Sequence, residues 1–215
     1  MLQDTQRQLS IVVASVNVGT YLLFKDLVVT GVFGADTSGW GLPHQVIAVS
    51  LIALSQGLFN HYGIRTTTAT HARVFTVAES HLVKTDIPGG HTKNLFMKDK
   101  QGQLVLISAH AESQLPLNQV HKVLGTQRLS FTDAPLLWEA LGVTPGSVTG
   151  FAVLNDQAKR VRFVLEEALL AHETLNFHPL RNDMTTAISR EDFLSFATAT
   201  GHTVTRVDFT KLGAA

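Results

Sequence analysis

Beyond about residue 60, short β-branched and apolar runs alternate with segments in which apolar residues recur at helical spacing. The first pattern is typical of strands and the second of helices. Two strand-like runs flank the turn sequence Asp99-Lys100-Gln101-Gly102, which predicts a hairpin. The patterns predict strands over 73–76, 92–98, 103–108, 148–154, 161–165, 174–177, 185–188 and 204–207, and helices over 77–83, 117–124, 133–141 and 189–199.

This mixture of short strands and helices predicts an α/β fold. The hairpin requires antiparallel pairing, whereas a purely parallel sheet would need a long crossover between every pair of strands. Ser189 is the predicted N-cap of the last helix, because Glu191 and Asp192 follow it in the first turn. We therefore expect a mixed, largely antiparallel or barrel-like sheet with surrounding helices.

The N-terminal part of the chain has a different character. Residues 1–45 are poor in charge and mix β-branched runs with a turn-rich segment that ends at Pro43. Over 46–62, apolar residues recur at helical spacing and Gly63 follows as a stop signal. We expect 46–215 to form the main domain. Residues 1–45 are then an added structural element, a partner-binding tail or a dispensable extension arising from a wrongly chosen start.

Composition and charge exclude several classes of function. The chain has 215 residues, with 17 basic residues balancing 17 acidic ones, so it lacks the positive field of a protein that coats duplexes. With no cysteine, it has no disulfide, thiolate nucleophile or cysteine-ligated metal. The apolar run 9–24 contains Ser, Asn, Gly and Thr and falls short of the roughly 20 apolar residues of a membrane span. We expect a cytoplasmic protein with no membrane partner.

The common catalytic signatures are missing. The chain contains no H-E-x-x-H, no G-x-S-x-G and no P-loop, and Gly89-Gly90-His91-Thr92-Lys93 has the wrong spacing for a P-loop. Its ten histidines show no paired ligand spacing. We therefore expect no metal and no cofactor.

An ordered series of motifs remains: HARVFTVAES, PGGHTKNLFMKDKQGQLVLI, RLSF, LGVTPGSVTGF, LND and NFHPLRNDMTTAI. Together they resemble the YbaK/prolyl-tRNA-synthetase-associated editing domain family, from about residue 51 to 207. The resemblance is strongest to its free-standing prolyl-tRNA editing proteins, which hydrolyse alanine wrongly attached to proline tRNA. It implies a YbaK-like fold and an aminoacyl-tRNA deacylase that uses neither a metal nor a protein nucleophile.

Lys93 is the principal candidate. At the start of a strand beside a Gly-Gly turn, its ammonium could serve as a compact phosphate-binding charge or be a solvated strand-end lysine. The resemblance favours the first role, because the lysine of the TKNLF motif is implied to hold the 3′ end of the tRNA. Asn94 of the same motif is assigned to substrate binding. Lys98 and Lys100, at the hairpin end, either steer the RNA backbone or form a solvated turn.

The loop 142–147 is the second candidate element. Gly142 and Gly146 flank Pro145, which allows close backbone approach to a substrate in a stiff loop, as an oxyanion-type site requires. A tight connection after a helix would explain the same residues. The resemblance favours an aminoacyl pocket, with Gly146 in a catalytic role and Gly142, Pro145 and Ser147 binding substrate.

Further positions bear on that pocket. His178 precedes Pro179 and is either a pocket residue or a structural hydrogen-bonding residue. Asn155-Asp156 most simply makes a turn. The family usually has proline where this chain has Gly150, so Gly150→Pro is expected to sharpen substrate preference, if it changes it at all. His71-Ala72-Arg73 replaces the commoner His-Pro-Pro, which could alter the rim that faces the tRNA.

The resemblance implies hydrolysis of alanyl-tRNA(Pro). A synthetase pocket sized for proline rejects smaller amino acids by only about 1–3 kcal/mol per missing methylene, so a second site for small residues is useful. The expected partner is the 3′ acceptor end of mischarged tRNA, with prolyl-tRNA synthetase or the elongation machinery as further partners. The alternatives are a deacylase for cysteinyl-tRNA(Pro) or another small aminoacyl-tRNA, and a noncatalytic RNA-end or synthetase-binding module.

Overall fold

The computed structural model describes residues 63–71, 87–180 and 182–212. The expected extension 1–45, the helices over 46–62 and 77–83 and the strand over 73–76 lie outside these residues. Within the described part, no helix is long and apolar enough to cross a membrane.

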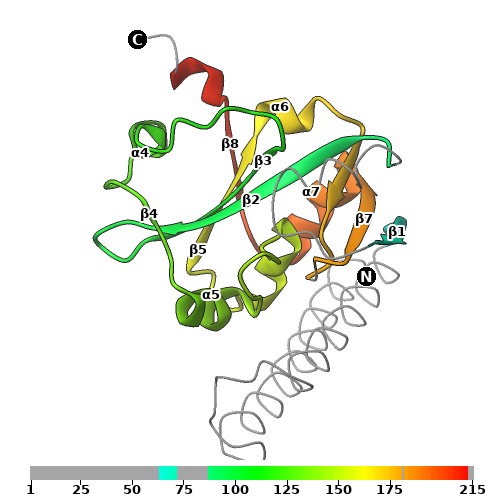
Figure 1. Ribbon diagram of the computed structural model, residues 1–215, viewed down its shortest axis with the longest axis horizontal. Coiled ribbons are helices and arrows are strands. Elements are labelled where there is room, and N and C mark those ends of the chain that lie inside the picture. The colour runs from blue at the N-terminus through cyan, green and yellow to red at the C-terminus, as the bar shows by residue number, and fades with distance from the viewer. Residues whose placement is uncertain (1–62, 72–86, 181, 213–215) are drawn as a thin grey trace, which may run out of the picture. The chain divides into compact units, whose positions relative to one another are not determined.

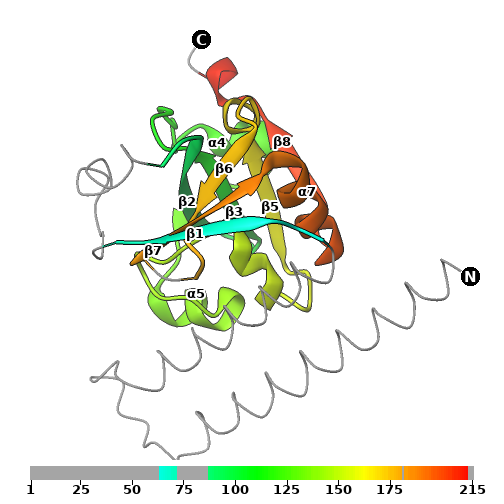
Figure 2. The same cartoon turned by 90° about the vertical axis from the view of Figure 1, so that its right-hand side faces the viewer.

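A mixed sheet forms the centre of the fold, which confirms the predicted α/β class (Figure 1). The path runs β1-β7-β6-β2-β3-β5-β8, with β4 paired to β2. Pairing is antiparallel for β1–β7, β7–β6, β2–β3 and β2–β4, and parallel for β6–β2, β3–β5 and β5–β8. The path is open, with β1 beside β7 at one end (Figure 2). The strands are β1 (Thr66–Thr70), β2 (Gly90–Lys98), β3 (Leu104–His110), β4 (Ser130–Phe131), β5 (Val161–Glu166), β6 (Thr174–Phe177), β7 (Met184–Ser189) and β8 (Val204–Val207).

Local signals predicted several elements correctly. The hairpin β2–β3 closes where Asp99 N donates to Gln103 O at 3.1 Å. Helix α5 (Ala134–Leu141) begins after Asp133, whose side chain accepts from Leu136 N. Helix α7 (Arg190–Ala199) begins after Ser189, which caps it by accepting from Asp192 N.

The two faces of the sheet carry separate apolar cores. On β3, Val105, Ile107 and Ala109 face a cluster that includes Val120 of α4 (Val120–Leu124) and Phe209 of η2 (Phe209–Leu212). The opposite face packs against α7 and the 3₁₀ helix η1 (Gly150–Asn155), through contacts among Phe151, Phe163, Phe177, Phe193 and Phe196.

Two sequence-based predictions need correction, and some short elements were not predicted. The run 148–154 was expected to be a strand but contributes to η1, because its apolar residues pack inside the phenylalanine cluster and periodicity does not separate such a run from a buried helix. The helix over 117–124 begins only at Val120, after a turn in which Gln119 N donates to Pro116 O. Strand β1, which is rich in threonine, and the short α6 (Glu167–Leu170) were not predicted, since neither has a clear apolar period.

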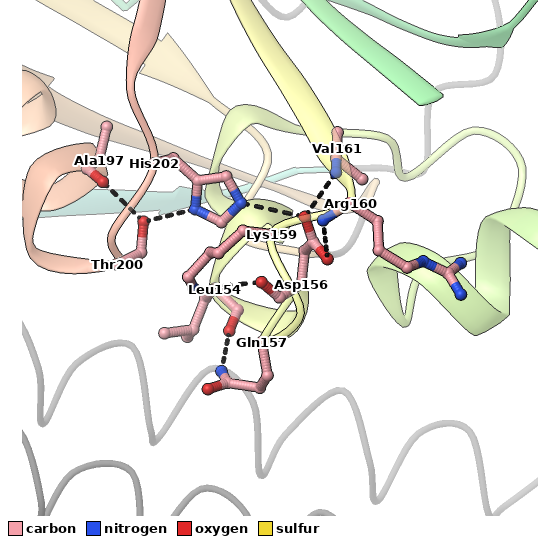
Figure 3. Close-up of polar contacts among 9 residues, drawn as sticks. All are labelled: Leu154, Asp156, Gln157, Lys159, Arg160, Val161, Ala197, Thr200 and His202. Carbon is pink, nitrogen blue, oxygen red and sulfur yellow. Dashed lines mark hydrogen bonds and ion pairs between the residues drawn. The ribbon is translucent and has the colours of Figure 1, made fainter. Parts of the chain in front are cut away.

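Asp156 joins the end of η1 to β5 and α7 (Figure 3). Its carboxylate is buried and accepts from Arg160 N at 3.0 Å, Val161 N at 2.7 Å and His202 Nε2 at 3.1 Å. His202 in turn contacts Thr200 Oγ1 through Nδ1 at 3.1 Å. The LND motif is therefore a buried structural junction, which is consistent with the predicted turn.

Candidate functional site

Lys93 lies on β2, where it pairs with Ala109 of β3. Its side chain is half-buried and Nζ donates to the carbonyl oxygen of Ser113, in the segment that follows β3. Burial lowers the pKa of Lys93, and the negative charge of Glu166 opposes that shift. The structure thus holds this lysine at a defined point, unlike a solvated strand-end lysine.

Glu166, the last residue of β5, was missed by sequence reasoning. It is 2% exposed, and Oε2 accepts from His110 N at 2.8 Å and from Ser113 Oγ at 2.7 Å. The available signal was an acidic residue directly after the apolar strand run Val161-Arg162-Phe163-Val164-Leu165. Buried carboxylates are uncommon without partners, so such a position indicates an organised polar site.

Asn94 is adjacent to Lys93 but faces the other side of β2. Its Oδ1 accepts from Ser108 Oγ at 2.6 Å, and its Nδ2 donates to Thr92 Oγ1 at 3.2 Å. Thr92 Oγ1 donates in turn to the carbonyl oxygen of Asn176 on β6 at 2.8 Å. This chain of hydrogen bonds holds the Asn94 amide in one orientation.

Gly142 owes its identity to the end of α5. It has φ 63°, and its N–H donates to Trp138 O at 2.9 Å, so it is a left-handed C-cap. A Cβ at this position would lie 2.9 Å from Asn155 Nδ2. Because its N–H is engaged in the cap, Gly142 shapes the loop and does not offer that donor to a substrate.

The remainder of the loop is a tight turn. Ser147 N donates to Thr144 O at 2.9 Å, Pro145 occupies the first central position and Gly146 the second, with φ 87°. This is the arrangement of a type II turn, which requires a positive φ where Gly146 stands. Pro145 and Gly146 are exposed at the tip, whereas Ser147 is buried. The stiffness expected of this loop therefore has a structural basis.

Gly150 connects that loop to the face of Asn94. It is buried at the start of η1, and a Cβ there would lie 2.8 Å from Phe193 Cζ, 2.9 Å from Phe177 Cε1 and 3.2 Å from Ser108 Oγ. The preceding Thr149 is extended, at φ −152° and ψ 154°, which is compatible with a following proline. The backbone before Gly150 would accept Gly150→Pro, but the close contacts of a Cβ show that the ring would crowd the core. The effect of this change on substrate preference stays a prediction.

His178 follows β6, and its Nδ1 lies 2.9 Å from the carbonyl oxygen of Met184. Its ring centre is 6.2 Å from that of His71, whose Nε2 lies 2.9 Å from Thr185 Oγ1. The buried Leu180 in the same connection has φ 65°, an unusual conformation for leucine. Among the described residues, no group of three or more histidines and acids is placed to hold a metal ion.

The hairpin end carries Lys98 and the exposed Lys100 on either side of the buried Asp99. Asp99 accepts from the backbone N–H of Gln103 at 2.9 Å and of Gln127 at 3.2 Å, which joins the hairpin to the segment before β4. Burial would raise the pKa of Asp99, but its backbone hydrogen bonds outweigh that effect and lower it. Close by on β4, Phe131 is 58% exposed.

The edge of β2 is interrupted where Lys93 and Asn94 lie. β3 pairs with one side of β2 from Thr92 to Lys98. On the other side, β6 pairs only at Gly90 and His91, and β4 only at Met97 and Lys98. Among the described residues, the intervening edge thus has no strand partner. A ligand placed at this edge could reach Lys93 on one face and Asn94 on the other.

Comparison with known proteins finds relatives that are linked by name to aminoacyl-tRNA editing or to prolyl-tRNA synthetase. The family model of the aminoacyl-tRNA editing domain matches residues 71–196. Prolyl-tRNA synthetase associated domain-containing protein 1 of Bos taurus is 39% identical over 153 residues, which cover 69% of this chain and 89% of the relative. Prolyl-tRNA editing protein ProX of Acetoanaerobium sticklandii is 30% identical over 146 residues, which cover 67% of this chain and 89% of the relative.

The fold is similar to that of solved structures. A crystal structure described as "a putative trans-editing enzyme for prolyl tRNA synthetase" superposes with a TM-score of 0.56 at 17% identity. The match covers 74% of this chain and 96% of that one. At this identity the likeness concerns the fold.

Proposed function

The chain belongs to the aminoacyl-tRNA editing domain family, and on that premise we propose that it hydrolyses the ester of alanyl-tRNA(Pro). The products are alanine and free tRNA(Pro). The proposal places the protein in the cytoplasm, acting on mischarged tRNA that prolyl-tRNA synthetase has released.

The observation that carries this proposal is the interrupted edge of β2. Lys93 has three N–H donors, of which the Ser113 carbonyl engages one, so the ammonium can still bind a phosphate of the RNA 3′ end. Asn94 holds its amide in a fixed orientation on the other face, through its hydrogen bond with Ser108. Ser108 also lies close to Gly150, which follows the 144–147 turn in the chain. A terminal aminoacyl-adenosine spanning the edge would meet both groups.

The chemistry requires orientation more than a protein nucleophile. In our proposal a free ribose hydroxyl of the terminal adenosine activates water, which attacks the ester carbonyl, and the bond to the ribose oxygen breaks. The Gly146 turn is exposed, and in our proposal its backbone stabilises the negative charge that develops on the carbonyl oxygen. Pro145, Ser147 and His178 would bound the aminoacyl group.

Substrate binding should be modest in strength. The chain has zero formal net charge, so few phosphates are neutralised and the salt dependence of binding should be shallow. Lys98 and Lys100 would steer the acceptor stem. Asp99 holds the turn that carries them by accepting hydrogen bonds from backbone N–H groups, including that of Gln127.

The test is deacylation of Ala-, Cys-, Ser- and Pro-tRNA(Pro) by the purified protein under multiple-turnover conditions. We expect hydrolysis of the alanyl ester and sparing of the prolyl ester, because the larger ring would clash with the 142–147 loop. Preferential hydrolysis of the cysteinyl ester would identify the protein as a different deacylase. Binding without turnover would identify it as an RNA-end module.

Lys93→Ala should lower kcat/KM for the alanyl ester at least tenfold. Lys122→Ala, which removes an exposed lysine of α4, is the matched control and should keep wild-type activity. Circular dichroism and thermal melting check that both variants fold. Full activity of Lys93→Ala would contradict the proposed site.

A further inference from the structure

Lys93 and Glu166 belong to one cross-strand row on the face of the sheet that also carries α4. Lys93 on β2 pairs with Ala109 on β3. Glu166 follows Leu165, the partner of Ser108, and therefore lies level with Ala109 on the next strand. At the usual strand spacing the two Cα atoms are about 10 Å apart. The small side chain of Ala109 between them lets the two longer side chains converge above it.

Ser113 connects the two charged residues. Its hydroxyl donates to Glu166 Oε2 at 2.7 Å, while its carbonyl oxygen accepts from Lys93 Nζ. The same Oε2 accepts from His110 N at 2.8 Å, which fixes the end of β3. The carboxylate thus holds the backbone that in turn holds the ammonium.

Glu166 is the buried acidic residue of this row, whereas its acidic neighbours in sequence are exposed. Glu112 and Glu167 are neighbours in sequence, but both are exposed. His110 and His172 stack at 5.0 Å between ring centres at the ends of β3 and α6, and His172 packs against Gly90. The electrostatic interaction of Glu166 with Lys93 favours the protonated amine and opposes the effect of burial.

We propose that Glu166 is a positioning residue for Lys93, acting through Ser113 to aim the ammonium at the unpaired edge of β2, where it receives an RNA phosphate. This inference rests on the proposed function for its biological meaning. The clamp itself is a property of the folded protein and can be measured without substrate.

Glu166→Gln is the direct test, since it removes the negative charge and replaces one acceptor oxygen by a donor. Glu167→Gln is the matched control, because it removes a neighbouring exposed carboxylate. NMR titration of labelled lysine, with the Lys93 signal assigned by its loss in Lys93→Arg, should show a lower pKa for Lys93 in Glu166→Gln than in wild type. The control should titrate as wild type.

The kinetic readout is the pH profile of Ala-tRNA(Pro) deacylation. On the alkaline side of the profile, the activity of Glu166→Gln should begin to decline at a lower pH than that of wild type. The reason is that Lys93 loses its proton at a lower pH in this variant. We expect kcat/KM near neutral pH to fall about tenfold, mainly through KM, because the ammonium is no longer held in place. A merely structural role would lower activity equally across the profile.

Ser113→Ala is the second variant if Glu166→Gln fails to fold, because it leaves the carboxylate and the carbonyl acceptor but breaks their connection. It should raise KM, because the backbone that holds the ammonium is no longer tied to the carboxylate, whereas the pKa of Lys93 should change less than in Glu166→Gln because the negative charge remains. An unchanged pKa of Lys93 in Glu166→Gln, or an unchanged KM in Ser113→Ala, would overturn the inference. If wild-type protein lacked deacylase activity, or Lys93→Ala kept it, the proposed function would be wrong while the titration still decided the clamp.

Discussion

Asp156→Asn should destabilise the fold strongly without altering the surface of the candidate site. One carboxylate oxygen accepts from Arg160 N, and the other accepts from Val161 N and His202 Nε2 (Figure 3). Asparagine has only one oxygen, so its NH₂ group must face at least one of these buried N–H donors. The side chain is 3% exposed, so water cannot readily replace the missing acceptor.

The magnitude follows from the hydrogen bonds lost. An unsatisfied buried polar group costs about 1–3 kcal/mol, and loss of the charged acceptor facing His202 adds to this. We expect the free energy of unfolding to fall by about 3 kcal/mol. For a chain of this size that corresponds to a decrease in Tm of about 6–12 °C.

The pH dependence supplies a sharper test. Burial would raise the pKa of Asp156, but hydrogen bonds from His202, Val161 and Arg160 outweigh it and lower the pKa. A depressed carboxyl pKa stabilises the fold above its unfolded value of about 3.9, and this stabilisation disappears as pH falls through the lower folded value. The stability difference between wild type and Asp156→Asn should therefore be largest at neutral pH and shrink in acid.

Urea unfolding at a series of pH values measures both quantities. Glu139→Gln is the control, since it removes a carboxylate whose contact with Arg160 is solvent-exposed and should change stability by less than about 1 kcal/mol. An Asp156→Asn protein within 1 kcal/mol of wild type at neutral pH, or a difference that does not change with pH, would refute the reasoning.

Two further predictions concern the core and the domain boundary. Gly150→Pro should lower the free energy of unfolding by about 1–3 kcal/mol through overpacking, and Phe193→Leu in the same chain should recover part of this loss. Chemical denaturation of the single and the double variant measures both free energies of unfolding. If the double variant regained no stability, the loss would come from backbone strain at position 150 and not from overpacking. A chain beginning at Val46 should keep a cooperative thermal transition and Ala-tRNA(Pro) hydrolysis, because every proposed site residue lies at or after Lys93. Aggregation or a much lower Tm of that chain would place the domain boundary earlier.

The sequence by itself determined the elements that have local chemical signals. Ser189 caps α7 as the sequence predicts, because an N-cap hydrogen bond is made within three residues. The turn at 99–102 and the apolar strand β5 follow from short-range pattern alone. Lys93 was singled out by the resemblance of an ordered series of motifs to a family, since its local sequence alone left a solvated lysine open.

Tertiary structure decided whatever depends on residues far apart in the chain. The apolar run of η1 packs against phenylalanines of β6 and α7, and no local signal contains that information. The need for glycine at position 150 likewise depends on Phe193, which lies 43 residues later in the chain. The pairing of Ser113 with Glu166 and the interrupted edge of β2 depend on strand register. Register is set by packing of both sheet faces at once, so only the folded chain shows which polar groups lie together.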